Sequence, residues 1–399
     1  MSPINLFEMK AIIKVIGVGG AGCNAVNRMI EAGLDGVDFV AANTDVQALN
    51  LSKAPQKIQL GLNKTRGLGA GGDPEVGEAS AIEAEKEILL HLEGADMVFI
   101  AAGMGGGTGT GAAPYIAELA RQRGILTVAV VSEPFMVEGG KRKRLARAGL
   151  EKMKSRVDSL IVIPNDLLPM AVGKATSVTD ALKAADEGLH QGVKGIAEIV
   201  LQPGLINVDF ADVKAVMTDA GLTIMGTGKG LGEKRARIAA QAAVQSPFST
   251  LSVQGAQKML VSFTVGPSFA MAEIHEAMDY LNQYIDPEEG DIYMGLAVEE
   301  GLGDQASVTV VAVGMPMVGA RPQDPAVFQV PDRSRGTGGR DRGIVGVPEE
   351  EPATKDELPP APIKTRRITP VGRLQPMDVS DFSDVTMPEF LKQYKSADL

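Results

Sequence analysis

The chain has 399 residues, of which 44% are hydrophobic and 22% charged, and its formal net charge is −11. This length predicts two domains with a substantial buried core. The acidic balance argues against nucleic acid as a direct partner, because duplex binding needs a basic face. No apolar run approaches membrane-spanning length and no signal-peptide pattern opens the sequence, so we expect a soluble cytoplasmic protein without direct membrane insertion.

The cysteine and histidine content argues against several kinds of metal site and catalytic site. Cys23 is the only cysteine, which excludes an internal disulfide and a cysteine-cluster metal site. The three histidines, His91, His190 and His275, are too scattered for a metal triad, and we expect no histidine-based nucleophilic catalysis. Any metal should be a hard ion such as Mg²⁺, held largely by phosphates and not by a dedicated protein cage.

The amino-terminal half alternates apolar β-rich runs with helix-like stretches. The β-rich runs are Ala11–Val18, Val37–Ala42, Met97–Ala102, Leu126–Val131 and Leu160–Pro164. Pro74–Leu92 and Ala112–Arg123 are two of the helix-like stretches between them. This alternation predicts a Rossmann-like α/β domain, in which a parallel sheet is covered on both faces and ligand loops follow the carboxyl ends of the strands.

Two glycine-rich loops fall where that rule expects a ligand. Gly17–Gly22 follows the first apolar run, and Gly105–Gly111 follows Met97–Ala102. Glycine lets a phosphate approach the backbone, and the N–H groups of a following helix supply positive potential. Because both loops come from strands of one sheet, they favour a single ligand with a long phosphate chain, such as a nucleoside triphosphate.

The first loop alone leaves a second interpretation open. Its G-x-G-x-x-G spacing from Gly17 also matches the dinucleotide fingerprint. Asp38 and Asp45 lie near the distance at which that fingerprint expects an acidic residue. A nicotinamide-dependent oxidoreductase would, however, leave the second loop unexplained. The sequence contains no G-x-x-x-x-G-K-[ST] motif, which excludes a P-loop enzyme.

A long amphipathic helix is predicted from Thr176 to Leu201, where Pro203-Gly204 ends it. Its apolar stripe, at spacings of three and four residues, comprises Val178, Leu182, Ala185, Leu189, Val193, Ile196 and Val200. We expect most of this stripe to pack in the core and the helix to connect two domains.

A second α/β unit and a tail complete the chain. The unit is predicted from β-rich runs at Lys258–Val265, Asp291–Val298 and Ser307–Val313 and a helix near Met271–Gln283. Pro316–Pro376 holds 11 of the 23 prolines and few large apolar residues, which predicts a disordered linker. Apolar and acidic residues cluster again in Asp378–Leu399, where a docking peptide and a frayed terminus are the two interpretations.

An acidic loop follows the long helix. Asn207, Asp209 and Asp212 lie close together in the sequence. Two carboxylates three residues apart can face one site, orient a water molecule and favour a cation. The alternative is structural, because Asp and Asn are common helix N-caps. The residues alone do not decide between the two.

Taken in order, these motifs resemble a known family. Gly17–Asn24, Asn43–Asp45, Gly67–Pro74, Gly105–Gly111 and Asn207–Asp212 are similar to the FtsZ family of bacterial tubulin-like cell-division GTPases. The similarity runs from about residue 10 to residue 315 and resumes near the carboxyl terminus. It implies a nucleotide-binding GTPase domain at 1–175, a connecting helix at 176–202, a second α/β (activation) domain at 203–315, a disordered linker at 316–376 and an adaptor-binding peptide at 377–399.

The resemblance also implies roles for individual residues. The GTP-binding residues would include Gly19, Gly20, Ala21, Gly22, Cys23, Asn24, Asn43, Asp45, Ala70, Gly71, Gly72, Gly103, Gly105, Gly106, Gly107, Thr108 and Gly109. Of these, Gly20–Asn24 would hold the α and β phosphates and Gly105–Gly109 the β and γ phosphates. Pro134, Glu138 and Arg142 would lie at the ribose and the rest of the nucleotide. Asn165 and Asp186 would read guanine, which favours GTP over ATP. Leu182 stands where the family commonly stacks a phenylalanine, which predicts weaker binding or faster exchange.

By the same resemblance, Asn207, Asp209 and Asp212 act in trans, in the nucleotide site of the neighbouring subunit. GTP hydrolysis would then depend on head-to-tail polymerisation into an open filament, and the filaments would form a cytokinetic ring at midcell, on the inner face of the membrane. The residues that would bind membrane adaptors and division regulators are Met387, Pro388, Phe390 and Leu391. The alternative is a tubulin-like filament with a non-division role, in shape control or plasmid partition, and the division-type peptide weighs against it.

Overall fold

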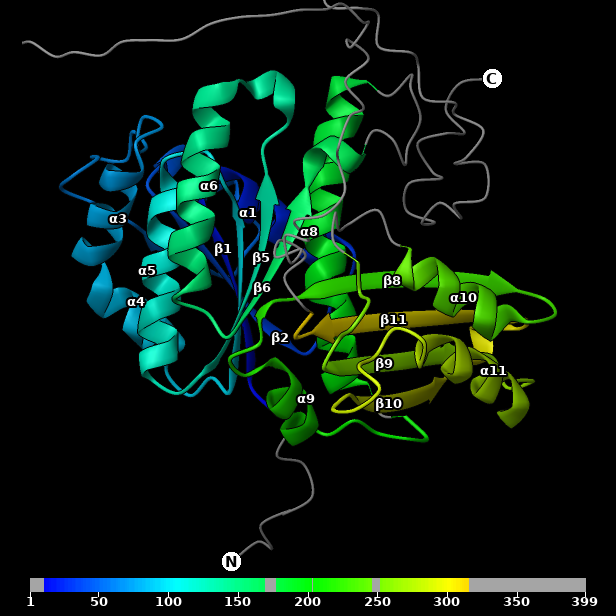
Figure 1. Cartoon of the computed structure of the whole chain (residues 1–399). Coiled ribbons are helices and arrows are strands. Elements are labelled where there is room, and N and C mark those ends of the chain that lie inside the picture. Colours follow the sequence, from blue (N-terminus) through cyan, green and yellow to red (C-terminus); the bar gives the residue numbers. More distant parts are fainter. Residues whose placement is uncertain (1–10, 169–176, 203, 246–251, 316–399) are drawn as a thin grey trace, which may run out of the picture. The chain divides into compact units, whose positions relative to one another are not determined.

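The amino-terminal part of the chain forms a seven-stranded parallel sheet. The computed structural model describes residues 11–168, 177–202, 204–245 and 252–315 (Figure 1). The strands are β1 (Ile13–Val18), β2 (Val37–Asn43), β3 (Gln56–Gln59), β4 (Met97–Gly103), β5 (Leu126–Glu133), β6 (Ser159–Pro164) and β7 (Gly221–Leu222). Their order is β3-β2-β1-β4-β5-β6-β7, and every pair is parallel. The expected Rossmann-like sheet is confirmed, while β3 and β7 were not predicted.

Helices cover both faces of this sheet. They are α1 (Gly19–Glu31), α2 (Val46–Leu51), α3 (Pro74–Glu83), α4 (Glu85–Leu92), α5 (Thr108–Gln122), α6 (Gly140–Lys154) and α8 (Val178–Leu201), with short 3₁₀ turns η1 (Met136–Glu138) and η2 (Asn165–Leu167). Val15 and Phe99 pack toward α1 and α8, whereas Ile16 and Ile100 pack toward the α3–α6 side. Since successive strand residues point to opposite faces, a doubly covered sheet needs an unbroken apolar run, and β1 is buried at all six positions.

Two helix predictions need correction. The expected helix Pro74–Leu92 is two helices, α3 and α4, which are divided at Ala84, where φ is −92° and ψ is 12°. Helix α5 begins at Thr108, before the expected start at Ala112. Thr110 therefore lies in a helical turn, where its Oγ1 accepts a hydrogen bond from the Gly105 N–H at 2.8 Å.

Helix α8 is buried on most sides along its central part. The predicted stripe is confirmed at Ala185, Leu189, Val193 and Ile196, which are all buried. Leu182 departs from it, because its side chain is 52% exposed. Leu189 and Val193 belong to one apolar cluster with strand residues of the first sheet and with Leu260 and Val311 of a second sheet. The helix therefore packs between the two sheets, as Figure 1 shows.

The second sheet has four strands. They are β8 (Ile224–Leu231), β9 (Lys258–Val265), β10 (Asp291–Val298) and β11 (Gln305–Val313), accompanied by α9 (Phe210–Met217), α10 (Arg235–Val244), α11 (Met271–Leu281) and η3 (Glu300–Leu302). The order is β10-β9-β11-β8, with β10 and β9 parallel and β11 antiparallel to both neighbours. The three expected strands and the helix near Met271 are confirmed, whereas β8 and α10 were not predicted and α9 was implied only by the capping alternative for the acidic loop.

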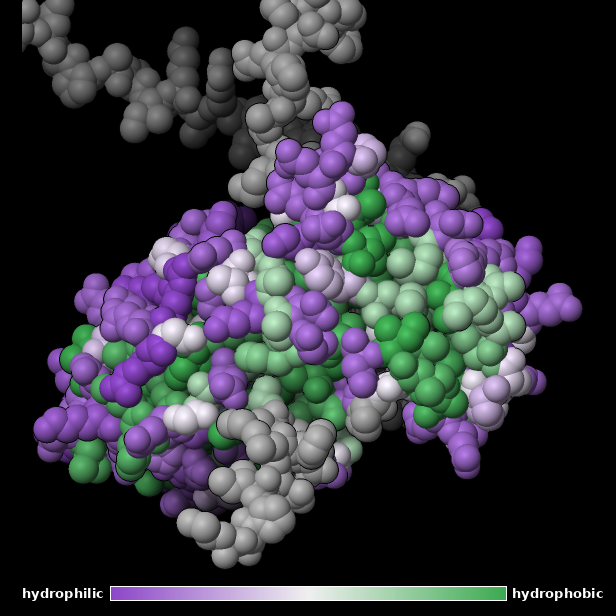
Figure 2. All heavy atoms as spheres, turned by 90° about the horizontal axis from the view of Figure 1, so that it is seen from below, coloured by the Kyte–Doolittle hydropathy of each residue, from purple (hydrophilic) through white to green (hydrophobic). Residues whose placement is uncertain are grey.

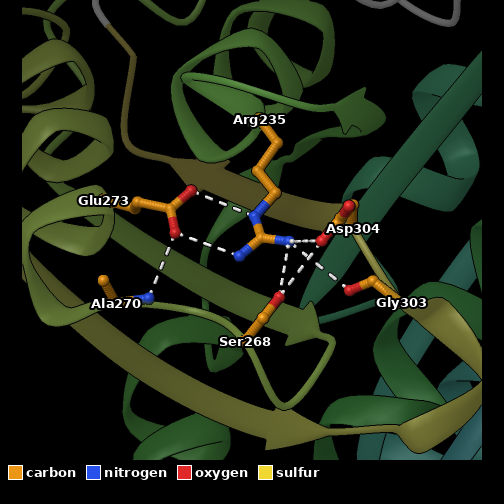
Figure 3. A network of polar contacts seen from close by, with 6 residues as sticks. All are labelled: Arg235, Ser268, Ala270, Glu273, Gly303 and Asp304. Atoms are coloured by element: carbon orange, nitrogen blue, oxygen red, sulfur yellow. Dashed lines mark hydrogen bonds and ion pairs between the residues drawn. The ribbon is translucent and has the colours of Figure 1, made fainter.

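One buried cation joins several loops of the second sheet (Figure 3). Arg235, at the start of α10, is 5% exposed and makes two hydrogen bonds to the Glu273 carboxylate, at 3.0 and 3.1 Å. Its Nη1 also donates to Ser268 Oγ at 3.1 Å, and its guanidinium lies 5.2 Å from the Phe269 ring centroid. A buried charge is tolerated only when it is paired and hydrogen-bonded, and these partners meet that requirement.

Two expectations lie outside the described residues. They are the linker at 316–376 and the terminal peptide at 377–399, including all four predicted adaptor-binding residues. Within the described ranges, no helix combines the length and the apolar character needed to cross a membrane.

Candidate functional site

The carboxyl ends of the central strands meet at one edge of the parallel sheet. Val18, at the end of β1, is in register with Ala42 of β2 and Ala102 of β4, and Gly103 is in register with Ser132 of β5. From β1 the chain continues to β2 on one side, and from β4 it continues to β5 on the other. Open α/β sheets bind ligands at such a switch point. Both glycine loops follow these two strands.

The helices that start at this switch point, α1 and α5, have no capping side chain. Their N-cap residues, Val18 and Gly107, make no side-chain hydrogen bond, and neither first turn contains an acidic residue. The first N–H groups of each helix have no partner within the helix, and its positive dipole end favours an anion. A Cβ added to Gly20 or Gly106 would meet no protein atom within 4 Å. Both loops thus offer donors beside open space.

Other glycines in these loops are required by close contact between backbones. A Cβ on Gly22 would lie 2.2 Å from the carbonyl oxygen of Ala101, so no larger residue fits between α1 and β4. The hydroxyl oxygens of Thr44 and Thr108 lie 2.6 Å apart and join the end of β2 to the start of α5. These contacts join the ends of β4 and β2 to the starts of α1 and α5, respectively.

The Gly67–Pro74 loop lies against the second glycine loop. A Cβ on Gly107 would be 2.8 Å from the Ala70 Cβ atom, so the two loops touch. Gly71 and Gly72 have left-handed φ values of +60° and +76°, and an added Cβ on either would meet nothing within 4 Å. Glycine adopts this backbone region without the steric cost that other residues pay. The loop therefore presents bare backbone beside α5.

Polar residues at the end of β2 make hydrogen bonds and contacts with other residues of the protein. Asp45 is the N-cap of α2, and its Oδ1 accepts from the Gln47 N–H at 2.8 Å. Asn43 is buried, and its Nδ2 lies 3.9 Å from Cys23 Sγ. Burial raises the pKa of the Cys23 thiol to about 12. The thiol stays protonated at neutral pH, so Cys23 is a packing residue and not a nucleophile.

Glu138 and Arg142 lie close together on η1 and α6. Glu138 Oε1 accepts from the Phe135 N–H at 3.0 Å, and its Oε2 pairs with the Arg142 guanidinium. A Cβ on Gly105 would lie 2.8 Å from the Arg142 carbonyl oxygen and 3.2 Å from Pro134 Cγ. The start of α6 therefore lies directly against the second glycine loop.

Asn165 and Asp186 are largely buried polar residues. Asn165 is 6% exposed, and its Oδ1 has no hydrogen-bond partner among the residues that the structure describes. An unpaired buried acceptor costs about 1–3 kcal/mol, so this oxygen is suited to a donor from a ligand or water. Burial raises the pKa of Asp186 to about 6, an effect that the Arg28 guanidinium, 3.9 Å away, opposes and that Glu187 reinforces.

Asn207, Asp209 and Asp212 lie beyond the other end of α8, as the position of α9 in Figure 1 shows. Asp209 is the N-cap of α9, and its Oδ1 accepts from the Asp212 N–H at 2.8 Å, while Asp212 Oδ2 accepts from the Asp209 N–H at 3.3 Å. The capping interpretation is thus confirmed for Asp209. From Asp186 to the end of α8 the helix spans roughly 22 Å at 1.5 Å per residue.

The face around this acidic loop contains apolar surface. Leu205 is 77% exposed and Ile206 is 37% exposed, and both immediately precede Asn207. Figure 2, which views the molecule from below, shows apolar areas between polar ones on this face. Exposed apolar residues also occur near the glycine loops, where Leu68 is 86% and Val137 is 94% exposed.

Sequence reasoning missed three residues of the site. Arg28 faces Asp186 from α1, and its position four residues after Asn24 on that helix was the available signal. Thr44 contacts Thr108. It belongs to the Asn43–Asp45 motif, but only Asn43 and Asp45 had been assigned to the site. Asp166 accepts from the Met136 N–H at 2.7 Å and pairs with Lys143 at 2.9 Å. The sequence carries no signal for that contact.

The chain has the architecture of a two-sheet α/β protein of the nucleotide-binding class. Its first sheet has a glycine loop on each side of the switch point, and a long helix connects this sheet to the second one. Two family models match: the Tubulin/FtsZ family, GTPase domain, at residues 12–172, and the FtsZ family, C-terminal domain, at 221–316. The chain belongs to the FtsZ family, within the wider tubulin/FtsZ group. This confirms the resemblance seen in the sequence motifs.

Individual relatives agree with this assignment. The cell division protein FtsZ of Caulobacter vibrioides is 52% identical over 309 residues, which cover 77% of this chain and 61% of that protein. The structure of an empty FtsZ dimer from M. jannaschii is 43% identical, has a TM-score of 0.72 and matches 77% of this chain and 90% of its own. CetZ2 from Haloferax volcanii, in a GTPγS-bound protofilament, has a TM-score of 0.65 at 21% identity, covers 77% and 94% of the two chains, and shows the shared fold.

Proposed function

We propose that this chain is a GTPase that polymerises head to tail, hydrolyses GTP at the contact between subunits and forms the division ring at midcell. The observation that carries the proposal is the pair of uncapped helix starts at one switch point, with bare glycine backbone in open space on each. One helix N-terminus suits one phosphate. Two helix N-termini, with the Gly67–Pro74 loop beside them, suit a triphosphate.

The phosphate chain would bring its own metal. Mg²⁺ in nucleotide sites is commonly held by phosphates and waters with one or two carboxylates. Asp45 and Asp73 cap α2 and α3 beside the loops, and each has a second carboxylate oxygen to offer. Among the described residues, no group of three histidine, cysteine or acidic side chains is arranged to hold a metal. Mg²⁺ would then be bound mainly by the GTP phosphates.

Guanine recognition would use the two largely buried polar groups. A carboxylate accepts from the N1–H and N2 amine of guanine, and adenine offers no such pair of donors. Asp186 is suited to this role, and Asn165 Oδ1, which has no hydrogen-bond partner among the described residues, would supply a further acceptor. Glu138 and Arg142, against the second loop, would contact the ribose and the rest of the nucleotide. Leu182 would cover the base without aromatic stacking.

Hydrolysis would need a second subunit. Asn207, Asp209 and Asp212 are separated from the glycine loops of their own chain by the length of α8, so they would reach the nucleotide of a neighbour. Asp209 and Asp212 each use one carboxylate oxygen in the capping box, which leaves the other oxygen for a water molecule or a cation. Exposed Leu205 and Ile206 at one end, with Leu68 and Val137 at the other, would provide apolar contact between stacked subunits.

A mixing experiment tests the shared site. Asp212→Ala should bind GTP normally but hydrolyse none, because its nucleotide faces a neighbour without this aspartate. Gly20→Asp should keep Asp212 but lose GTP, since a carboxylate then occupies the phosphate position. An equimolar mixture should recover activity, because in random head-to-tail stacking about one quarter of the contacts join a binding head to an intact tail. The measurement is phosphate release with Mg²⁺.

Controls make this experiment decisive. Asp38→Ala changes an exposed aspartate on β2, with the same loss of charge, and should hydrolyse GTP at the unmodified rate. Wild-type specific activity should rise with protein concentration from near zero. A mixture that stays inactive although both variants fold, or a specific activity independent of dilution, would place a complete site in one chain and contradict the proposal.

The partners outside the described residues complete the proposal. Met387, Pro388, Phe390 and Leu391 would dock on membrane adaptors and division regulators, so the filament would reach the inner face of the membrane without inserting into it. An apolar and acidic peptide at the end of a proline-rich segment is a common docking arrangement. The name of the C. vibrioides relative, cell division protein FtsZ, supports this role.

A further inference from the structure

Asp166 lies between the two parts of the site that would read the base and the ribose. Strands β5 and β6 are neighbours whose ends are in register, Glu133 with Pro164. The chain beyond β5 forms the turn η1, which contains Glu138, and the chain beyond β6 forms η2, which begins at Asn165. Asp166 follows Asn165 directly and contacts η1. None of the roles proposed above uses this residue.

The hydrogen bonds within η1 are local. The Glu138 N–H donates to the Phe135 carbonyl oxygen at 3.0 Å, and the Phe135 N–H donates to Glu138 Oε1 at 3.0 Å. The turn itself packs little, because Met136 is 68% and Val137 94% exposed. Gly139 follows with a φ of 97°, and glycine leaves the backbone free to adopt other conformations. Beyond the buried Phe135, the position of Glu138 therefore depends on hydrogen bonds with other parts of the chain.

Asp166 supplies such a contact with both of its carboxylate oxygens. The Met136 N–H donates to Oδ1 at 2.7 Å, and Lys143 Nζ, from α6, donates to Oδ2 at 2.9 Å. Among the described residues, no other hydrogen bond joins η1 to a residue outside Phe135–Arg142. Hydrogen bonds to an ionised group are roughly twice as strong as neutral ones. One carboxylate therefore holds both the turn and the start of α6.

We propose that Asp166 is a positioning residue, which holds η1 so that the Glu138 carboxylate meets the hydroxyl groups of a bound ribose. This inference rests on the proposed function, in which Glu138 contacts the ribose. A carboxylate has lone pairs left after accepting one hydrogen bond on each oxygen. It accepts well from two neighbouring hydroxyls only when its place is fixed, because hydrogen bonds weaken steeply with misalignment. Since Asp166 adjoins Asn165, it also sets the ribose contact relative to the base contact.

Calorimetric titration of the nucleotide-free full chain, with GDP and with 2′,3′-dideoxy-GDP, tests the proposal. The second nucleotide lacks both ribose hydroxyls but keeps the base and the phosphates, so the ratio of the two affinities measures the hydroxyl contact. The wild type should bind GDP about tenfold or more tightly, as expected for hydrogen bonds to a charged group. Asp166→Ala should reduce this ratio about three- to tenfold and leave the affinity for dideoxy-GDP nearly unchanged, because only the ribose contact is displaced.

Three further variants serve as comparisons. Glu138→Ala should lower the ratio to about one, since the carboxylate itself is gone. Asp166→Asn should keep most of the wild-type ratio, because its amide oxygen still accepts from the Met136 N–H. Asp96→Ala is the matched control, because it removes an exposed aspartate that accepts the Ile12 N–H at 2.8 Å, before the first residues of β1 and β4. It should leave the ratio at the wild-type value.

The outcomes separate this inference from the proposed function. A wild type that binds both nucleotides equally, or Glu138→Ala with an unchanged ratio, would contradict the ribose role of Glu138 and this inference with it. If both results are as expected, an unchanged ratio in Asp166→Ala would overturn the inference alone. An equal loss of affinity for both nucleotides in Asp166→Ala would also overturn it, since that result would show damage to the whole site.

Discussion

Replacing Gly20 with alanine separates the phosphate-binding role of the first loop from its structural role. Gly20 lies in the first turn of α1, has no left-handed φ, and an added Cβ would meet no protein atom within 4 Å. Alanine should therefore fit the folded protein and raise its stability by about 0.4–1 kcal/mol through the lower entropy of the unfolded chain. If a phosphate occupies the open space, the methyl group displaces it and weakens charge-assisted hydrogen bonds worth about 1.5–3 kcal/mol.

The expected result is a protein with an unchanged or higher urea midpoint whose affinity for GDP falls by about ten- to a hundredfold. Urea unfolding monitored by circular dichroism measures the first quantity, and a fluorescent GDP analogue at low protein concentration measures the second. Gly301→Ala, in the 3₁₀ turn η3 where an added Cβ would meet only the Glu299 side chain, at 4.0 Å, should leave nucleotide affinity unchanged. Gly20→Ala with wild-type affinity, or with a clear loss of stability, would refute the reasoning.

Two further substitutions test the electrostatics of the fold. Because burial raises the pKa of Asp186 from 3.8 to about 6, the folded state binds this proton more tightly, and the contribution of this carboxyl group to stability should rise as the pH falls from about 7 to 4. Asp186→Asn removes the cost of burying the ionised carboxylate, which is up to about 3 kcal/mol at pH 7. The Tm of the variant should therefore be higher than that of the wild type at pH 7 and should depend less on pH between about 7 and 4. A lower Tm at pH 7 would contradict this prediction. Arg235→Met should lower the free energy of unfolding, measured in urea, by about 2–4 kcal/mol, because it leaves the Glu273 carboxylate without its cationic partner. The exposed Arg237→Met is the control and should lower it by less than about 1 kcal/mol. Equal losses would show that the buried network adds nothing to stability.

The central strands of the first sheet could be predicted because their signal is local. An unbroken apolar run such as Met97–Ala102 has few alternatives to a buried strand, and the glycine loops then follow from the rule for parallel sheets. Strands β3 and β8 escaped prediction for the opposite reason. Gln56–Gln59 is mostly polar on the edge of its sheet, and β8 contains three glycines, so neither has a local strand signal.

The site could be predicted only as far as its residues are adjacent in sequence. Asn43, Asp45 and the glycines were found because they occur in compact motifs, whereas the partner of Asp186 is Arg28, 158 positions away. The length of helix that separates Asp209 from the glycine loops is likewise a property of the folded chain. The choice between a capping and a catalytic role for Asp209 could not be made from its spacing, because the capping box is present and does not occupy the whole carboxylate.

The left-handed glycines of the Gly67–Pro74 loop lie in a short segment that is held at both ends. The loop is fixed at both ends, by a bridge between Asp45 and Leu68 and by the cap that Asp73 forms on α3. Between these anchors, Gly71 and Gly72 have left-handed φ values, and an added Cβ on either would meet nothing within 4 Å. Rearrangements of this size take nanoseconds to microseconds, whereas shifts of whole domains take microseconds to milliseconds. Under the proposed function, this loop would therefore respond to the loss of a phosphate before the rest of the subunit relaxes.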